Sequence, residues 1–196
     1  MEKIKQEIIV KIASDTILFF DMDGTLVDTD FANFLSYKKA IQSIIQIDND
    51  ILYNPNERLN RGLLKKVVPN LTESEYEQII QQKEENYTEY LPQTKLNNLV
   101  ADILIKYSQT HKTVLVTNCR EDRALMTLNY HNLTDKFNNL FFRELSKNTS
   151  RINKFQNAIL SLGISPKLII AYENEESEII DAINAGIQYI NPIIKI

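Results

Sequence analysis

The sequence predicts an α/β protein, with a parallel sheet covered by helices on both faces and a small helical cap inserted after the first strand. From residue 96 onward, short hydrophobic segments that suit buried strands alternate with segments of helical period. Such alternation is typical of parallel sheets with right-handed crossovers. It lapses only in residues 28–91, which contain helical patterns and no convincing strand. We therefore expect a core formed by residues 1–27 and 92–196, and a cap formed by residues 28–91.

Each predicted strand is a short apolar run bounded by polar residues or glycine. The first, "TILFFD" (16–21), is rich in isoleucine and phenylalanine, as expected of a strand that is covered on both faces. Later segments of the same character are "TVLVTN" (113–118), "NLFFREL" (139–145), "KLIIAYE" (167–173) and "GIQYIN" (186–191). Together with the first run, they predict the core sheet.

The predicted helices of the core lie between these strands. Residues 96–107 place a set of apolar side chains on one helical face: Leu96, Leu99, Val100, Ile103, Leu104 and Tyr107. Further helices are predicted in residues 120–133, 154–163 and 177–186. The last of them ends in Gly186, a favourable C-terminal cap.

Two helices are predicted in the inserted segment. Residues 30–46 have a helical period, and a second helical segment opens with Thr72 and Glu75 at the spacing of a capping box. Pro92 is expected to mark the return of the chain to the core. At the N-terminus, residues 1–16 alternate charged side chains with isoleucine and valine and indicate a short amphipathic helix.

Composition and charge restrict the class of protein. The chain has 196 residues, enough for one core domain with an inserted lobe. Its net charge is −4 and its lysines and arginines are scattered, so we expect no nucleic-acid partner. No apolar run reaches the ~18–20 residues of a membrane span, and the N-terminus lacks the apolar region of a signal peptide. One cysteine, Cys119, cannot form an internal disulfide. We expect a cytoplasmic protein without a membrane partner, as a monomer or weak dimer.

Two aspartates directly follow the first strand. Residues i and i+2 of a strand point to the same side, so Asp21 and Asp23 leave the strand end together before Gly24 turns the chain. Sites in parallel α/β sheets lie at the carboxyl ends of strands. Two carboxylates that repel each other there suit Mg²⁺, which prefers oxygen ligands and accepts phosphate as a further one. The alternative, two acids that only cap a helix and face water, is the weaker interpretation of this pattern.

The segment "DMDGTLVDTD" (21–30) resembles motif I of the haloacid dehalogenase-like superfamily, in its phosphatase and phosphomutase branch. "VLVTN" (114–118) is similar to motif II, and "LTDKFNNLFF" (133–142) resembles the stretch that leads into the third strand. "LIIAYENEESEIIDAINAGI" (168–187) resembles motif IV in the register of β-phosphoglucomutase and phosphoglycolate phosphatase. The helical insertion lies where this subfamily carries its cap. The resemblance covers nearly the whole chain. It implies a three-layer Rossmann-like core and a Mg²⁺-dependent phosphatase for a small phosphorylated metabolite.

The resemblance also implies roles for individual residues. Asp21 would be the nucleophile that forms an aspartyl-phosphate, and Asp23 the general acid and then the general base. Thr117 would donate its hydroxyl to the phosphoryl group, and the backbone N–H groups of Met22, Asp23 and Asn118 would complete the phosphate cradle. The Asp21 carboxylate and the Asp23 carbonyl would bind the metal. Because dehalogenase branches lack the second aspartate, Asp23 favours phosphoryl transfer.

The family's motif III is a lysine at the start of the helix after the third strand, and its familiar "KPxP" pattern is absent. The candidates are Lys147, Arg151 and Lys154. Lys154 is preferred because it follows Asn153, a favourable N-cap. Arg151 keeps the spacing to Gly163 of a related pattern. All three side chains could instead face solvent, as most lysines and arginines do.

Motif IV normally offers adjacent acids, whereas this chain has Glu173 and Asn174. Asn174 can bind Mg²⁺ through its amide oxygen but supplies no charge, Glu173 can bind directly or through water, and Glu178 is a further acidic candidate. This departure leaves a weakly active or non-catalytic sensor of a phosphorylated ligand as an alternative function. A phosphomutase of the β-phosphoglucomutase type is another. The retained nucleophile, second aspartate and threonine favour the phosphatase.

A basic segment of the cap holds Arg58, Arg61, Lys65 and Lys66 around Gly62. The subfamily places a substrate-specificity loop near this point. Arg58 or Arg61 there could bind a carboxylate or a second phosphate of the substrate. A solvated helix face is at least as good an interpretation.

Overall fold

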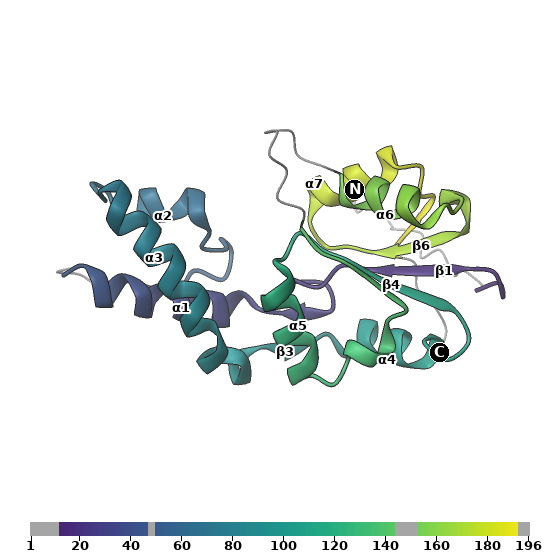
Figure 1. Ribbon diagram of the computed structural model, residues 1–196, viewed down its shortest axis with the longest axis horizontal. Coiled ribbons are helices and arrows are strands. Elements are labelled where there is room, and N and C mark those ends of the chain that lie inside the picture. The colour runs from purple at the N-terminus through teal and green to yellow at the C-terminus, as the bar shows by residue number, and fades with distance from the viewer. Residues whose placement is uncertain (1–11, 47–49, 144–152, 192–196) are drawn as a thin grey trace, which may run out of the picture. The chain divides into compact units, whose positions relative to one another are not determined.

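The computed structural model describes residues 12–46, 50–143 and 153–191 (Figure 1). The chain forms two compact units. The unit called the core below comprises Met1–Leu26 and Asn97–Ile196, and the unit called the cap comprises Val27–Leu96.

The core contains a five-stranded sheet in the order β5-β4-β1-β6-β7, in which every neighbouring pair is parallel. Its strands are β1 (Ile17–Phe20), β4 (Lys112–Val116), β5 (Asn139–Phe141), β6 (Ile169–Tyr172) and β7 (Tyr189–Ile190). The expected parallel sheet is confirmed, although β5 and β7 are shorter than the segments expected at 139–145 and 186–191. β1 is the central strand, so the residues that follow it have strand ends on both sides.

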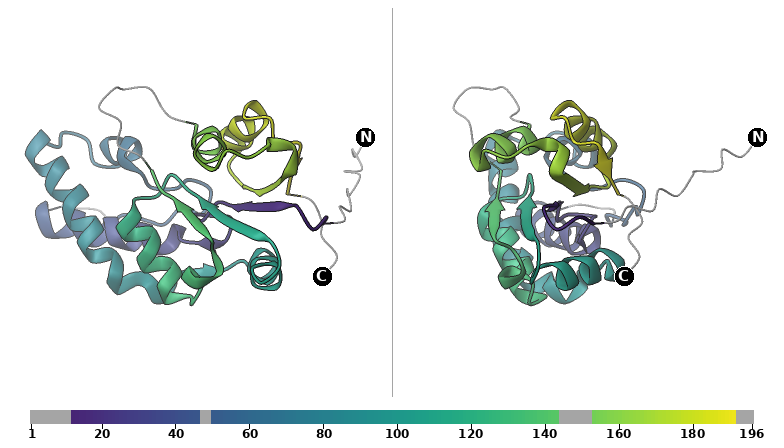
Figure 2. Two further views of the ribbon diagram at one scale, coloured as in Figure 1. Left: turned by 45° about the vertical axis from the view of Figure 1, so that its right-hand side comes forward. Right: turned by 90° about the vertical axis from the view of Figure 1, so that its right-hand side faces the viewer.

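Helices cover both faces of this sheet (Figure 1 and Figure 2). α4 (Asn98–Tyr107) and α5 (Glu121–Tyr130) lie on one face, and α6 (Lys154–Leu162) and α7 (Glu176–Asn184) on the other. The strand order explains this division. The chain moves outward through β4 and β5 and then returns across the sheet to β6 and β7, and right-handed crossovers in opposite directions place their helices on opposite faces.

The central strand is buried on both faces because successive residues of a strand point to opposite sides. Ile17 and Phe19 belong to the apolar cluster that includes Phe155 of α6 and packs under α6 and α7. Phe20 points to the other face, where its ring stacks on that of Tyr172 with 5.2 Å between ring centroids. Burial on both sides accounts for the uninterrupted apolar run of β1.

The cap is a helical unit that begins and ends in a two-stranded ribbon. Its elements are β2 (Val27–Asp28), α1 (Asp30–Ile44), α2 (Arg61–Val67), α3 (Glu73–Asn86), the 3₁₀ helix η1 (Tyr87–Gln93) and β3 (Lys95–Leu96). Their side chains form an apolar core around Phe34, Ile41 and Leu64. The predicted capping box is confirmed. The Thr72 hydroxyl accepts from the Glu75 N–H, and the Glu75 carboxylate accepts from the Thr72 N–H.

The structure differs from the expectations at both ends of the inserted segment. Asp28 belongs to β2, which pairs antiparallel with β3 and sets Val27 opposite Leu96, so residues 28–91 are not free of strand. Pro92 lies inside η1, and the chain leaves the cap only after β3. Strands of two residues are too short to show a period in the sequence, which is why they were not expected.

The buried face of α4 also differs from the expected one. Leu99 is 74% exposed, and Leu96 lies in β3 rather than in the helix. α4 buries Val100, Ala101, Ile103 and Leu104. The buried stripe therefore includes Ala101, whose small side chain the apolar pattern did not count.

The amphipathic helix expected in residues 1–16 falls largely outside the described residues, and the described residues 12–16 form a turn. Among the helices of the described ranges, none has both the length and the apolar character needed to cross a membrane.

Candidate active site

A tight turn after β1 places two aspartates at the carboxyl end of the sheet. The Asp21 N–H donates to the Tyr172 carbonyl (3.0 Å) and continues the β1–β6 pairing. The Met22 carbonyl then accepts from the Thr25 N–H (3.3 Å). Gly24 adopts φ +82°, a backbone conformation that favours glycine. The turn leaves Asp21 buried at the strand end.

A buried lysine contacts acidic side chains beside this turn. Lys154 Nζ lies 2.7 Å from both Asp21 Oδ1 and Glu173 Oε2. It is 3.7 Å from Glu178 Oε2. None of these side chains is more than 7% exposed. The structure thus brings together groups from the ends of β1 and β6 and from the first turns of α6 and α7.

The local sequence explains the position of Lys154. It is the first residue of α6, and the Asn153 side chain caps the helix by accepting from the Gln156 N–H (3.0 Å). Side chains in a helix point back toward its N-terminus, which directs this lysine to the sheet edge. Of the three candidates for motif III, the structure brings Lys154 to Asp21. Lys147 and Arg151 lie outside the described residues.

Burial and charge oppose each other in this cluster. Burial raises the pKa of Asp21 to about 7, against the lowering effect of the Lys154 ammonium, and the nearby Glu173 charge raises it further. Burial by itself would lower the pKa of Lys154, but the charges of Asp21 and Glu173 outweigh it and raise that pKa above its usual value. Lys154 is therefore charged at neutral pH, whereas Asp21 keeps its proton to a higher pH than an ordinary aspartate does.

The end of β4, the neighbour of β1, contributes Thr117 and Asn118. The Thr117 hydroxyl oxygen accepts from the Cys119 N–H (3.1 Å). Asn118 Nδ2 donates to Glu178 Oε1 (2.9 Å) and so ties this strand end to the acidic cluster. Because parallel strands end at one edge of their sheet, Thr117 and Asp21 share that edge.

The end of β6 carries Glu173 and Asn174. Glu173 Oε1 accepts from the N–H groups of Asn174 and Glu175, both at 2.9 Å. Asn174 Oδ1 accepts from the Thr25 hydroxyl (2.9 Å). Glu173 is thus linked to the candidate nucleophile through Lys154, whereas Asn174 is held against the turn after β1.

Gly24→Ala should destabilise the core. A Cβ at Gly24 would lie 2.7 Å from Asn174 Nδ2, and a positive φ is unfavourable for alanine. We expect the free energy of unfolding to fall by roughly 1–3 kcal/mol, as measured by urea denaturation followed by circular dichroism. Gly62→Ala is the control, because Gly62 lies in α2 and a Cβ there would lie 3.4 Å from Asn60 Oδ1, an ordinary contact distance. That variant should be neutral or slightly stabilised. A Gly24→Ala protein as stable as wild type would contradict the described packing.

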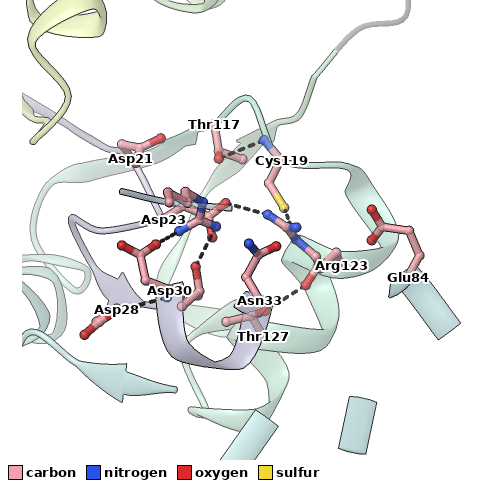
Figure 3. A network of polar contacts seen from close by, with 12 residues as sticks. Asp21, Asp23, Asp28, Asp30, Asn33, Glu84, Thr117, Cys119, Arg123 and Thr127 are labelled. Carbon is pink, nitrogen blue, oxygen red and sulfur yellow. Dashed lines mark hydrogen bonds and ion pairs between the residues drawn. The ribbon is translucent and has the colours of Figure 1, made fainter. Parts of the chain in front are cut away.

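Sequence reasoning missed one polar residue of this region, Arg123. Its Nη2 lies 3.0 Å from Asp23 Oδ2, and its Nε donates to Cys119 Sγ (3.0 Å) (Figure 3). Burial raises the pKa of Cys119 to about 12, so the sulfur belongs to a neutral thiol. Arg123 belongs to no motif. The sequence held one signal: a cation is unfavourable in the first turn of a helix, and Arg123 lies in the first turn of the helix that follows motif II.

The candidate arginines of the cap have different surroundings within that unit. The Arg58 guanidinium forms an ion pair with Asp30 and donates to the Thr29 hydroxyl (3.0 Å). Arg61 is the exposed first residue of α2, and its carbonyl accepts from the Tyr76 hydroxyl (3.2 Å).

Comparisons with known proteins show the family and the fold of the chain. The model of the haloacid dehalogenase-like hydrolase family matches residues 18–191. No curated protein matches the chain in sequence. One similar solved structure is a predicted phosphoglycolate phosphatase from Haemophilus somnus 129PT, with 20% identity, a TM-score of 0.71 and coverage of 93% of this chain and 90% of that chain.

Two further structures share the fold. CbbY from Rhodobacter sphaeroides, solved in complex with phosphate, has 15% identity and a TM-score of 0.70, covering 91% of this chain and 86% of its own. A β-phosphoglucomutase-like protein from Thermotoga maritima has 23% identity and a TM-score of 0.66, covering 89% of this chain and 83% of its own. At these identities the structures establish a common fold. The family match runs from β1 to β7 and includes the strand ends described above. The chain belongs to the haloacid dehalogenase-like hydrolase family.

Proposed function

We propose that this protein is a phosphatase that hydrolyses a small phosphorylated metabolite through an aspartyl-phosphate on Asp21. The observation that carries the proposal is the buried contact of 2.7 Å between Lys154 Nζ and Asp21 Oδ1, at the carboxyl end of the central strand. It sets a fixed positive charge beside the carboxylate that would attack phosphorus, where an anionic phosphoryl group would otherwise be repelled. Membership of a hydrolase family supports the proposal.

The chemistry needs two steps. In the first, an Asp21 oxygen would bond to phosphorus while the bond to the leaving oxygen breaks, and Asp23 would give that oxygen a proton. In the second, Asp23 would take a proton from water as the water oxygen attacks phosphorus, which releases phosphate and restores the Asp21 carboxylate. The groups proposed to bind the phosphoryl oxygens are the Thr117 hydroxyl, Lys154 and the backbone N–H groups of Met22, Asp23 and Asn118.

The donor set of the site fits Mg²⁺. Three buried carboxyl groups lie around the Lys154 ammonium, so the cluster carries excess negative charge when all of them are ionised. Mg²⁺ prefers oxygen ligands and usually takes one or two carboxylates together with waters and substrate phosphate. We propose that it binds the Asp21 carboxylate, the Asp23 carbonyl and the Glu173–Asn174 corner. When bound, the ion would neutralise charge on the phosphoryl group. In the described ranges, no group of three or more His, Cys, Asp or Glu side chains is arranged to hold a metal. The proposed set has only two such side chains, Asp21 and Glu173, and completes itself with the Asp23 carbonyl and the Asn174 amide oxygen.

Asn174→Asp is expected to tighten Mg²⁺ binding, because a carboxylate adds a negative charge that the amide lacks. Mg²⁺ should raise the midpoint of thermal unfolding of the wild type, since a ligand that binds only the folded state stabilises it. The rise should be larger in Asn174→Asp at the same Mg²⁺ concentration. Asn98→Asp, at an exposed position in α4, is the matched control and should respond as the wild type does. An equal or smaller response of Asn174→Asp would argue against Asn174 as a ligand.

A phosphate-release screen tests the proposed function. The protein is incubated with a panel of phosphorylated metabolites and with p-nitrophenyl phosphate, once with Mg²⁺ and once with EDTA. Release that needs Mg²⁺ would support the proposal, and the preferred substrate would show its class. If folded wild type releases phosphate from no compound, the protein is not a phosphatase for these substrates.

Two alternatives have a specific basis. Asn174 in place of an acid favours a sensor, which would bind phosphorylated ligands saturably without releasing phosphate. The resemblance to a β-phosphoglucomutase-like structure favours a phosphomutase. In a phosphomutase a sugar hydroxyl replaces water as the acceptor, and an isomerised sugar phosphate would appear without free phosphate.

The cap is proposed to supply substrate contacts through Arg58 and Arg61. Arg58 already pairs with Asp30, so it would bind a substrate anion by sharing or exchanging that partner. Arg61 is exposed on α2. Alanine variants of each should raise KM for the preferred substrate more than they lower kcat.

A further inference from the structure

Arg123 connects the first turn of α5 to the second aspartate of the turn after β1. The Nη2–Oδ2 distance between Arg123 and Asp23 is 3.0 Å, although these residues are 100 positions apart in the sequence. Their side chains are 15% and 19% exposed. The Arg123 Nε donates to Cys119 Sγ (3.0 Å), and the Arg123 carbonyl accepts from the Thr127 hydroxyl (2.9 Å). Both ends of the arginine are therefore held (Figure 3).

Helix stability does not account for an arginine at this position. A cation in the first turn of a helix opposes the helix dipole and costs about 0.3–1 kcal/mol at an exposed site. The first turn of α5 also contains Glu121 and Asp122, which suit that position. The contacts that favour Arg123 are therefore those its side chain makes outside its own helix, with Asp23 and Cys119.

The chemistry of the guanidinium restricts what Asp23 can do. A guanidinium has only donors and accepts no hydrogen bond. While Oδ2 accepts a hydrogen bond from Arg123, a proton on Oδ2 that pointed at the guanidinium would find no acceptor there. A proton that Asp23 passes to a leaving group would therefore be carried by Oδ1.

We propose that Arg123 is a positioning residue that fixes the Asp23 carboxylate through Oδ2 and assigns proton transfer to Oδ1. The inference rests on the proposed phosphatase function, in which Asp23 protonates the leaving oxygen. Arg123 itself need not touch the substrate. Cys119 contributes because its Sγ accepts from Arg123 Nε, which orients the guanidinium with Nη2 toward Asp23.

The test is the dependence of kcat/KM on the leaving group, because kcat/KM reports the steps up to cleavage of the substrate's phosphate ester. The substrates are p-nitrophenyl phosphate, phenyl phosphate and glycerol 2-phosphate, whose leaving oxygens need increasing protonation. For Arg123→Gln we expect kcat/KM to fall by roughly 10–100-fold with glycerol 2-phosphate, since general acid catalysis contributes about 10²–10⁴-fold. With p-nitrophenyl phosphate the fall should be no more than about threefold, because that leaving group needs little protonation.

Two further variants make the test specific. Arg123→Lys retains a donor but loses the planar fork, so its leaving-group dependence should be intermediate. Arg120→Gln is the matched control, because Arg120 pairs with Asp122 at the start of the same helix and is 43% exposed. It should behave as wild type with all three substrates. Thermal unfolding of each variant shows that it is folded, and if Arg123→Gln does not fold, Arg123→Lys carries the test.

Several outcomes would overturn the inference. An equal fall for all three substrates in Arg123→Gln would mean that Arg123 only supports the packing of α5. Unchanged kinetics would mean that Asp23 needs no such partner. A steeper leaving-group dependence in Arg120→Gln would assign the effect to the helix start as a whole. If wild type hydrolyses none of the three substrates or the metabolite panel, the proposed function fails first, and the inference fails with it.

Discussion

Asp21→Asn is expected to abolish phosphate release and yet to leave the protein as stable as wild type or more stable. An amide is a poor nucleophile and cannot form the acyl phosphate, so turnover should fall by a factor of at least about 10³, to the background of the assay. The fold should survive because Lys154 keeps its contacts with Glu173 and Glu178. Loss of activity without loss of structure would separate the role of Asp21 in chemistry from any role in folding.

The pKa of Asp21 gives the direction of the stability change. Its value is raised from 3.8 to about 7 in the folded state, first of all by burial. The folded state therefore holds this proton more tightly than the unfolded chain does. Between about pH 4 and about pH 7, the carboxyl of Asp21 binds more protons in the folded state than in the unfolded chain. The free energy of unfolding therefore falls as the pH rises through this range. Asparagine carries no such charge. Without Mg²⁺ at pH 8, the midpoint of thermal unfolding of Asp21→Asn should be higher by roughly 2–6 °C.

Three measurements check this prediction: phosphate release, thermal unfolding at pH 5 and at pH 8, and binding of BeF₃⁻ with Mg²⁺ as a mimic of aspartyl-phosphate. Wild type should bind the mimic and Asp21→Asn should not. Asp102→Asn, at an exposed position of α4, is the matched control and should change none of the three. Wild-type turnover in Asp21→Asn would show that another residue is the nucleophile.

Lys154→Met should give the largest loss of stability. Removal of the ammonium leaves three buried carboxyl groups without the cation that they share, and breaking a buried ion pair from one side costs about 3–5 kcal/mol. The loss should be greater at pH 8 than at pH 5, because burial raises the pKa of Asp21 to about 7 and its uncharged form needs no cation beside it. Turnover should fall as well, by about 10²–10³-fold, if Lys154 stabilises the phosphoryl group as proposed.

Urea unfolding of Lys154→Met at both pH values checks the prediction. Lys167→Met is the control, since Lys167 is exposed in the turn before β6 and the same change there removes no buried charge. Added Mg²⁺ should restore part of the lost stability, because the ion supplies positive charge to the same carboxylates. A deficit that is equal at pH 5 and pH 8 would point to lost packing of the side chain instead of lost charge.

The sequence predicted those parts of the fold that have a local signal. β1 and β6 are continuous apolar runs, and β4 ends in the apolar run Val114–Val116, because these residues are buried. Runs of this kind can be recognised without a structure. Lys154 could be selected among three candidates because Asn153 is a good N-cap, which is a property of adjacent residues. The two-residue strands β2 and β3 have no period, and only their pairing with each other defines them.

The parts that could not be predicted depend on contacts between distant segments. Arg123 meets Asp23 only because the order of the strands brings the start of α5 to the end of β1. The Thr25–Asn174 hydrogen bond, whose partners are 149 positions apart in the sequence, has the same origin. Leu99 has the side chain of a core residue, and only the packing of α4 through Ala101 leaves it exposed.

The chain leaves the core after Leu26 and re-enters it at Asn97, and these two residues are neighbours in the structure. Val27 pairs with Leu96, and in the core the Asn97 N–H donates to the Leu26 carbonyl (3.0 Å). A short turn joining Leu26 to Asn97 would therefore close the core chain with every strand of its sheet in the same order. The segment between them is topologically a cassette. During evolution it could be lengthened, shortened or exchanged while the strands of the core sheet kept their order.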